Sequence, residues 1–264
     1  MSKYHIEDDE VRKYFHQEYS RANFRVVPGH WPNFKTKEEV DDWFELMVKL
    51  GKDLLEQFNE DKNTNILSFK GDESLLYSQS KFVGVIGSRK ATKEELAAAH
   101  KLSQLLVKKG YIVVSGLAIG VDTEAHKGAI DGGGKTIAIV STSPDEKIYP
   151  RENTSLAMKI IRNGLIVYPY DSPARWAKGF GQPQKRLIER DILLAYLCPR
   201  IVAVSDSDYI TGGTAWALNY GHKYSKELWR VDSNFIFHKS PNFENKAISW
   251  DMEIDLTLVD NIFL

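Results

Sequence analysis

The sequence predicts an α/β protein with a doubly wound, mostly parallel sheet, preceded by a helical N-terminal extension. Three observations lead to this prediction. Short apolar, β-rich runs recur from about residue 64 onward. Helical segments separate them, and this alternation is typical of parallel strands covered by helices on both faces. Residues 1–63 instead combine charge and aromatic residues with a helical spacing of apolar positions. We therefore expect an extension over 1–63 and one α/β domain over 64–264.

The extension is expected to contain a long amphipathic helix. Thr36 followed by Glu39 forms a capping-box pattern that marks a helix start. Apolar residues then recur at helical spacing, namely Val40, Trp43, Phe44, Met47, Val48, Leu50, Leu54 and Leu55. The polar run FNEDKNTN follows as a linker.

In the second part of the chain, continuous apolar runs predict buried strands. The expected strands are 82–86, 111–115, 136–140, 165–168, 200–204 and 227–231. KEELAAAHKLSQLLVKKG between the first two predicts a helix that Gly110 ends. DTEAHKGAIDGGG predicts a shorter helix before the third. After Asp232 the pattern becomes irregular, and the last segment, 249–264, is expected either to add a strand or to cover an edge.

Composition limits the function classes. The 264 residues carry a net charge of −1, so a nucleic-acid site would have to be a local basic patch. Cys198 is the only cysteine, which excludes an intramolecular disulfide and fits a reducing compartment. No run approaches the ~20 apolar residues that span a bilayer. The charged N-terminus lacks the apolar core of a signal peptide. We expect a cytoplasmic protein with no membrane partner.

Polar or glycine-rich turns follow several predicted strands, at the sheet edge where α/β proteins bind ligands. Gly87, Ser88 and Arg89 follow the first strand, and the cation suggests an anionic ligand. SGLAIGVDTEAH follows the second and supplies Ser115, Gly116, Gly120 and Asp122. Its glycines would let the backbone approach a ligand, and the amides of the next helix would face a phosphate. The alternative for each stretch is an ordinary glycine turn.

Two further stretches lie after later strands. Gly212, Gly213 and Thr214 precede a helix and could form a phosphate-binding nest or only a helix cap. YPRENTSL is a weaker candidate, a loop whose Asn153 and Thr154 could start a helix.

Asp122 and His126 share a helical face because they are four residues apart. They could form a general acid/base pair, or Asp122 could cap the helix while His126 packs nearby. The histidines are scattered and the cysteine is alone, so no transition-metal spacing appears. The sequence contains neither a Gly-x-Ser-x-Gly elbow nor a Walker loop.

A mixed basic and aromatic segment, WAKGFGQPQKRLIERD, could bind a nucleic-acid strand through its cations and rings. The residues concerned are Trp176, Lys178, Phe180, Lys185, Arg186 and Arg190. The alternative is a solvated helix whose charge Glu189 and Asp191 balance.

These stretches together resemble the DprA/Smf family of DNA-processing proteins. The similarity runs from ILSFKGDESLL through VGVIGSRKAT, VVSGLAIGVDTEAHKGAI, GGGKTIAIV, IYPREN and NGLIVYP to GGTAWALNYG, roughly residues 64–232. The family belongs to a wider group of Rossmann-like nucleotide-binding domains that includes the LOG phosphoribohydrolases. The resemblance implies a Rossmann-like sheet that binds single-stranded DNA, loads a recombinase onto it and usually forms a dimer.

The resemblance also implies a phosphate-binding pocket. Its Gly-Ser-Arg turn maps onto Gly87, Ser88 and Arg89, and its Ser-Gly-Leu-Ala turn maps onto the stretch from Ser115 to Asp122. Where the family has Arg-Asn-Arg-Ile-Ile-Ala, this chain reads ERDILLA, so Arg190, or Arg186 a turn earlier, would stand in.

Two functions remain open at this level. The first is single-stranded DNA binding in DNA processing and recombination, without catalysis. The second is binding or N-glycosidic hydrolysis of a free nucleotide, as in the LOG branch. Hydrolysis is disfavoured because Ala217 and Leu218 stand where that branch has an acidic residue. Neither function requires a cofactor or a metal.

Overall fold

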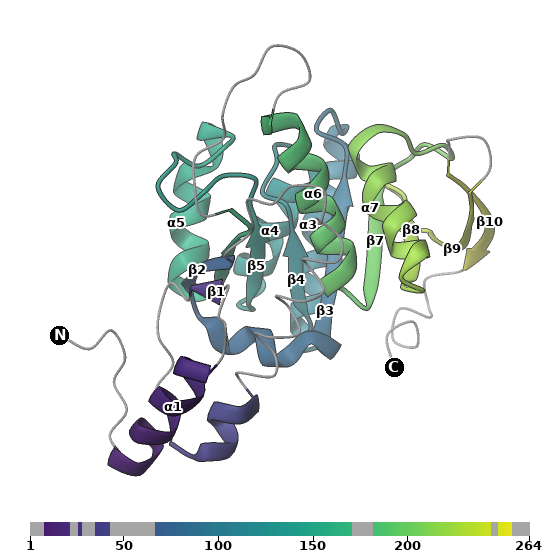
Figure 1. Ribbon diagram of the computed structural model, residues 1–264. Coiled ribbons are helices and arrows are strands. Elements are labelled where there is room, and N and C mark those ends of the chain that lie inside the picture. The colour runs from purple at the N-terminus through teal and green to yellow at the C-terminus, as the bar shows by residue number, and fades with distance from the viewer. Residues whose placement is uncertain are drawn as a thin grey trace.

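The computed structural model describes residues 8–21, 26–27, 35–42, 67–170, 182–243 and 248–254 (Figure 1). A ten-stranded sheet runs through them in the order β1-β2-β6-β5-β4-β3-β7-β8-β9-β10. The strands are β1 (Val26–Val27), β2 (Leu67–Gly71), β3 (Phe82–Gly87), β4 (Ile112–Ser115), β5 (Thr136–Ile139), β6 (Leu165–Tyr168), β7 (Arg200–Val204), β8 (Glu227–Val231), β9 (Phe237–Asn242) and β10 (Ser249–Ile254).

The six strands predicted from apolar runs are all present, and they form the parallel centre of the sheet, from β6 to β8. Antiparallel strands extend it on both sides. β2 pairs with β6, β9 pairs with β8, and β10 pairs with β9. The C-terminal segment thus adds a strand, which was one of the two outcomes expected for it.

Helices cover both faces of the sheet (Figure 1). The helices of the described ranges are α1 (Asp9–Arg21), α3 (Lys93–Lys108), α4 (Val121–Asp131), α5 (Thr154–Asn163), α6 (Gln182–Leu197) and α7 (Gly212–Lys223), with the 3-10 segments η1 (Glu73–Lys81) and η2 (Arg151–Asn153). Along β3, Phe82 and Ile86 belong to one hydrophobic cluster with α6 and α7, whereas Val83 and Val85 belong to another with α3 and α4. The doubly wound α/β fold is therefore confirmed.

The N-terminal extension is described only in part. The capping box at Thr36 is present, since Glu39 N donates to Thr36 Oγ1 at 3.2 Å and Thr36 N donates to Glu39 Oε2 at 3.4 Å. A helical turn follows over 37–42, and the rest of the predicted helix lies outside the described residues. Val11 and Val40 are buried in the same cluster as the sheet. The boundary at residue 63 also falls outside the described residues and stays a prediction.

The order of the strands creates a topological switch point beside β3. The chain runs from β3 through β4 and β5 to β6 on one side of the sheet, and then returns to place β7 and β8 on the other side. Parallel α/β sheets bind ligands outside the carboxyl ends of the two strands that flank such a point, because the loops leave them in opposite directions. None of the helices in the described ranges has the length and hydropathy needed to cross a bilayer.

Candidate functional site

A cavity of about 630 Å³ opens at the switch point, outside the carboxyl ends of β3 and β7. Strand-end residues Ile86, Gly87, Val204 and Ser205 line it, together with the N-terminus of α7. Nine of the residues predicted from sequence line this switch-point cavity: Gly87, Ser88, Arg89, Gly116, Asp122, Arg190, Gly212, Gly213 and Thr214. Motifs that are far apart in the sequence therefore meet at one place, as expected for carboxyl ends of parallel strands.

The Gly-Ser-Arg turn presents a cation at the mouth of the cavity. Ser88 Oγ accepts a hydrogen bond from Lys90 N at 3.0 Å, which fixes the turn. Arg89 and Lys90 are both exposed and both line the cavity. Arg89 makes no ion pair with any residue in the described part of the chain. An exposed guanidinium at the end of a buried strand is suited to contact a phosphate.

Arg190, on α6, is a second cation in the cavity, but it is buried and already engaged. It is 4% exposed, and its Nη1 donates to the Gly116 carbonyl. Its Nε lies 2.8 Å from Asp191 Oδ1, and its Nη1 lies 3.7 Å from Asp122 Oδ2. A Cβ on Gly116 would come within 1.7 Å of Arg190 Nη1. The absence of a side chain at Gly116 therefore leaves room for Arg190. The sequence had predicted that it leaves room for a ligand.

Gly120 and Ser115 lie outside the cavity lining and act as supports. Gly120 has φ of +86°, and a Cβ there would lie 2.3 Å from the Ser88 carbonyl oxygen. The glycine is needed because the Gly-Ser-Arg turn packs directly on the start of α4, where Val121 N donates to the same oxygen at 3.3 Å. Ser115 is fully buried, and its hydroxyl donates to the Val85 carbonyl at 2.6 Å. The close approach predicted for Gly120 is thus to protein backbone.

Two carboxylates share the cavity with the cations. Burial raises the pKa of Asp191 to about 6, against the opposing attraction of Arg190, and nearby Asp122 raises it further. Burial also raises the pKa of Asp122, while Arg190 and a hydrogen bond from Ala118 N oppose the shift. The cavity therefore has a mixed charge whose balance depends on the protonation of Asp191.

Asp122 and His126 have different surroundings and different hydrogen-bond partners in the structure. His126 is fully buried, and burial lowers its pKa to about 3, so it is neutral at physiological pH. Its Nδ1 lies 2.7 Å from Thr136 Oγ1, which itself donates to the Val113 carbonyl, so His126 donates to that oxygen. It does not line the cavity. His126 is therefore a packed histidine, whereas Asp122 bonds Ala118 N and the N-cap of α4 is Gly120.

The start of α7 leaves backbone donors facing the cavity. Its N-cap, Thr211, makes no side-chain capping bond, and the first-turn residues Gly212, Gly213 and Thr214 line the cavity. A Cβ on Gly213 would have only Asp191 Oδ2 nearby, at 3.7 Å. First-turn amides have no partner within their helix, so these are available to an anion.

The mixed basic and aromatic segment is only partly described. Trp176, Lys178 and Phe180 lie outside the described residues, as does the side chain of Lys185. Arg186 is buried at 8% exposure, stacks 4.0 Å from the Tyr170 ring centroid and pairs with Glu146 at 3.3 Å. The structure does not bring Arg186 into the switch-point cavity. Of the two arginines that could stand in for the family motif, Arg190 occupies the site.

Sequence reasoning missed one supporting residue, Asn153. It is buried, and its amide donates to the carbonyl of Leu117 at 2.9 Å and to Thr123 Oγ1 at 2.8 Å. Leu117 has φ of +59°, an unusual conformation for leucine, which this bond helps to hold. The sequence indicates only a helix start at Asn153. Groups able to hold a metal ion are absent from the described ranges.

Comparison with known proteins identifies relatives that share this region. Protein Smf of Synechocystis sp. is 35% identical over 130 residues, which cover 48% of this chain and 32% of the relative. DNA processing protein DprA of Streptococcus pneumoniae is 35% identical over 137 residues, covering 52% of this chain and 45% of the relative. The chain thus spans between 32% and 45% of the length of these two curated relatives.

Solved structures with a similar fold include two DNA processing proteins. DprA from Streptococcus pneumoniae matches with a TM-score of 0.53 and 28% identity, over 62% of this chain and 54% of that one. DNA processing protein A from Helicobacter pylori, which binds single-stranded DNA, matches with a TM-score of 0.54 and 28% identity, over 62% of this chain and 71% of that one. The family model for DNA recombination-mediator protein A matches residues 52–248. This match spans more than half of the sequence, so the chain belongs to the DNA recombination-mediator protein A family.

Proposed function

We propose that this protein binds single-stranded DNA in the switch-point cavity and acts in DNA processing and recombination. One observation carries the proposal. The exposed Arg89, which has no ion-pair partner among the described residues, lines the same cavity as the N-terminus of α7, which has no side-chain cap. A phosphate between them would meet a cation and backbone amides together. Family membership and the DNA-binding relative from Helicobacter pylori support DNA as the source of that phosphate.

Binding without catalysis fits the cavity better than hydrolysis of a nucleotide. Ala217 lines the cavity and Leu218 is fully buried, so neither position where the related phosphoribohydrolases have an acid can supply one. The carboxylates that are present, Asp122 and Asp191, lie beside Arg190. No cofactor is needed for this role.

The proposal extends to the partners of the protein. A recombinase is the expected protein partner, since the family is that of recombination mediators. A homodimer is the expected assembly, as the resemblance implies. We also propose that the protein acts in the cytoplasm, which is compatible with a DNA ligand.

The length and salt dependence of binding test the proposal. A DNA strand must have several phosphates neutralised, whereas a free nucleotide pairs only one or two charges. For a long oligothymidylate we expect log K to fall with log salt by about 0.7 for each phosphate contacted. Fluorescence anisotropy with the oligonucleotide and competition by thymidine monophosphate across a salt series give both slopes. Equal, shallow slopes for the two ligands would reject the DNA strand in favour of a free nucleotide.

Asp191 makes the proposed binding depend on pH. Its raised pKa of about 6 means that it is mostly ionised at neutral pH and becomes neutral as the pH falls below that value. An ionised Asp191 repels a phosphate, and even with the full screening of water a close pair of like charges interacts by about 1 kcal/mol, so the change in affinity should be at least about fivefold. Oligonucleotide binding should therefore strengthen as the pH falls through about 6.

The Asp191→Asn variant separates this effect from other titrations. It should bind more tightly than the parent at neutral pH and lose the change near the pKa of Asp191. The ligand must lack a terminal phosphate, so that only internal phosphodiesters are present and the ligand itself does not titrate. Parallel pH profiles for parent and variant would show that Asp191 does not face the bound phosphate.

A further inference from the structure

We propose that Tyr209 is a stacking platform for a nucleobase, placed so that a strand held by Arg89 lays one base on its ring. This inference rests on the proposed function and deepens it, because it assigns a base-binding subsite to a cavity so far described only by its phosphate-binding groups. Single-stranded nucleic acids are bound by this combination of cations for the backbone and aromatic rings for the bases.

Tyr209 is unusually exposed for an aromatic residue. It is 68% exposed, the highest value among the exposed large hydrophobic residues of the described ranges. It also lines the switch-point cavity, which Arg89 and the start of α7 line too. Its ring makes no aromatic stack or cation contact within the described part of the chain. An exposed ring costs solvation free energy, so one at the rim of a ligand cavity is a candidate for ligand contact.

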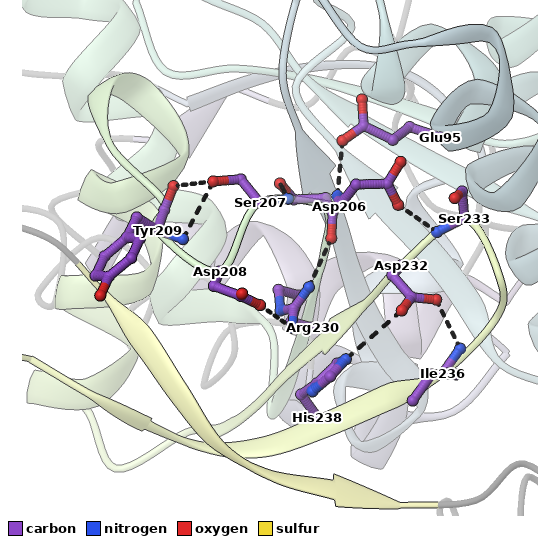
Figure 2. Close-up of polar contacts among 11 residues, drawn as sticks. Glu95, Asp206, Ser207, Asp208, Tyr209, Arg230, Asp232, Ser233, Ile236 and His238 are labelled. Atoms are coloured by element: carbon purple, nitrogen blue, oxygen red, sulfur yellow. Dashed lines mark hydrogen bonds and ion pairs between the residues drawn. The ribbon is translucent and has the colours of Figure 1, made fainter.

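The backbone of Tyr209 is held by hydrogen bonds even though its side chain is exposed. The Ser207 hydroxyl accepts from Tyr209 N at 3.1 Å and donates to the Tyr209 carbonyl at 2.8 Å (Figure 2). Ser205 Oγ in turn accepts from Ser207 N at 3.1 Å. Because the backbone is already ordered, less conformational entropy is lost when a base stacks on the ring, which favours binding.

The loop that carries Tyr209 is anchored to the body of the domain. Arg230, on β8, is 2% exposed, donates to the Ser205 carbonyl at 3.0 Å and pairs with Asp208 at 3.0 Å (Figure 2). Asp206 Oδ1 accepts from Ser233 N at 2.6 Å, on the loop after β8. In Figure 2 these side chains converge on the loop, while the Tyr209 ring points away from them.

Glu95 connects this loop to the helix that follows the Gly-Ser-Arg turn. One of its carboxylate oxygens completes the capping box of α3 by accepting from Thr92 N at 2.7 Å. The other accepts from Asp206 N at 2.8 Å. The turn that carries Arg89 and the loop that carries Tyr209 are thus joined through one buried carboxylate, which holds the backbones of the two segments in place relative to one another.

A base-specific comparison tests the inference. Tyr209→Ala should weaken binding of oligothymidylate by roughly tenfold, the effect of losing one stacked base. The same change should leave unaltered the affinity for an oligomer of equal length made of abasic deoxyribose phosphates, because that ligand has no base to stack. Tyr209→Phe should bind like the parent. Tyr77→Ala is the matched control, since Tyr77 is also exposed, at 46%, but lies on η1 and does not line the cavity.

The outcomes separate this inference from the function on which it rests. Equal losses with thymidylate and abasic oligomers would overturn it, because Tyr209 would then only shape the loop. The inference would also be overturned if the parent binds DNA and Tyr209→Ala binds both ligands as well as the parent does. In that case the proposal of DNA binding would stand. A parent protein that binds neither oligomer would overturn the proposed function together with the stacking site.

Discussion

Replacing Gly120 by alanine should abolish measurable binding of oligonucleotides. The new Cβ would lie 2.3 Å from the Ser88 carbonyl oxygen and 2.9 Å from Arg89 Cα. Both neighbours are backbone atoms, so the Gly-Ser-Arg turn would have to move away from α4. The φ of +86° and ψ of −133° at Gly120 are also accessible to glycine almost alone. Overpacking of this kind lowers the free energy of unfolding by about 1–3 kcal/mol.

Gly110→Ala provides a matched control. Gly110 has nearly the same φ, +85°, but a Cβ there would meet nothing within 4 Å. We expect this variant to lose some thermal stability from backbone strain and to keep its affinity for DNA. Thermal unfolding and anisotropy titrations of the two variants give the comparison. If Gly120→Ala binds as well as Gly110→Ala, the position of the Gly-Ser-Arg turn does not matter for binding.

Replacing Arg89 by alanine should weaken oligonucleotide binding by roughly tenfold to a hundredfold, since a hydrogen bond to a charged group contributes about 1.5–3 kcal/mol. The stability of the fold should change little, because Arg89 is exposed and has no ion pair with a described residue. The salt slope should also become shallower by roughly the contribution of one phosphate, about 0.7.

Lys108→Ala is a suitable comparison for Arg89→Ala. Lys108 is an exposed cation at the end of α3, before the amino end of β4 and so at the opposite edge of the sheet. Its removal changes the net charge equally and should leave binding nearly unchanged. Equal losses from both variants would mean that DNA senses the overall charge of the protein and that Arg89 has no specific contact.

The core strands could be predicted because the sequence encodes them locally. Strands buried on both faces need apolar residues at nearly every position, and FVGVI or RIVAV satisfies this requirement without reference to the rest of the chain. β2 and β9 were missed because they are antiparallel strands toward the edges. Their sequences, LSFKG and FHKSPN, mix polar residues with few apolar ones.

The location of the candidate site could also be predicted from the sequence, but the structural role of each residue in it could not. Strand-end motifs must meet at one edge of a parallel sheet, so grouping them needed only the strand assignments. Two contacts depend on how α6 and α4 pack in three dimensions. Arg190 lies over Gly116, and Gly120 packs against Ser88. Spacing along the sequence carries no signal of these contacts.

The environments of Tyr209 and Asn153 could not be predicted from the sequence either. Asn153 lies within a stretch that the sequence analysis singled out and Tyr209 lies three residues before another, yet neither residue type suggests its environment. A tyrosine is more often packed than exposed, and the exposure of this one follows from the three-dimensional position of its loop, which Arg230 helps to anchor.

Amide hydrogen exchange with and without a saturating single-stranded oligonucleotide tests most directly whether DNA occupies the switch-point cavity. We expect slower exchange in peptides that cover the Gly-Ser-Arg turn at 87–90 and the loop and helix start at 205–214. Peptides from α1 and from β9 to β10 should exchange at the same rate with and without DNA. Protection of those outer elements, with 87–90 and 205–214 unchanged, would contradict binding in the cavity.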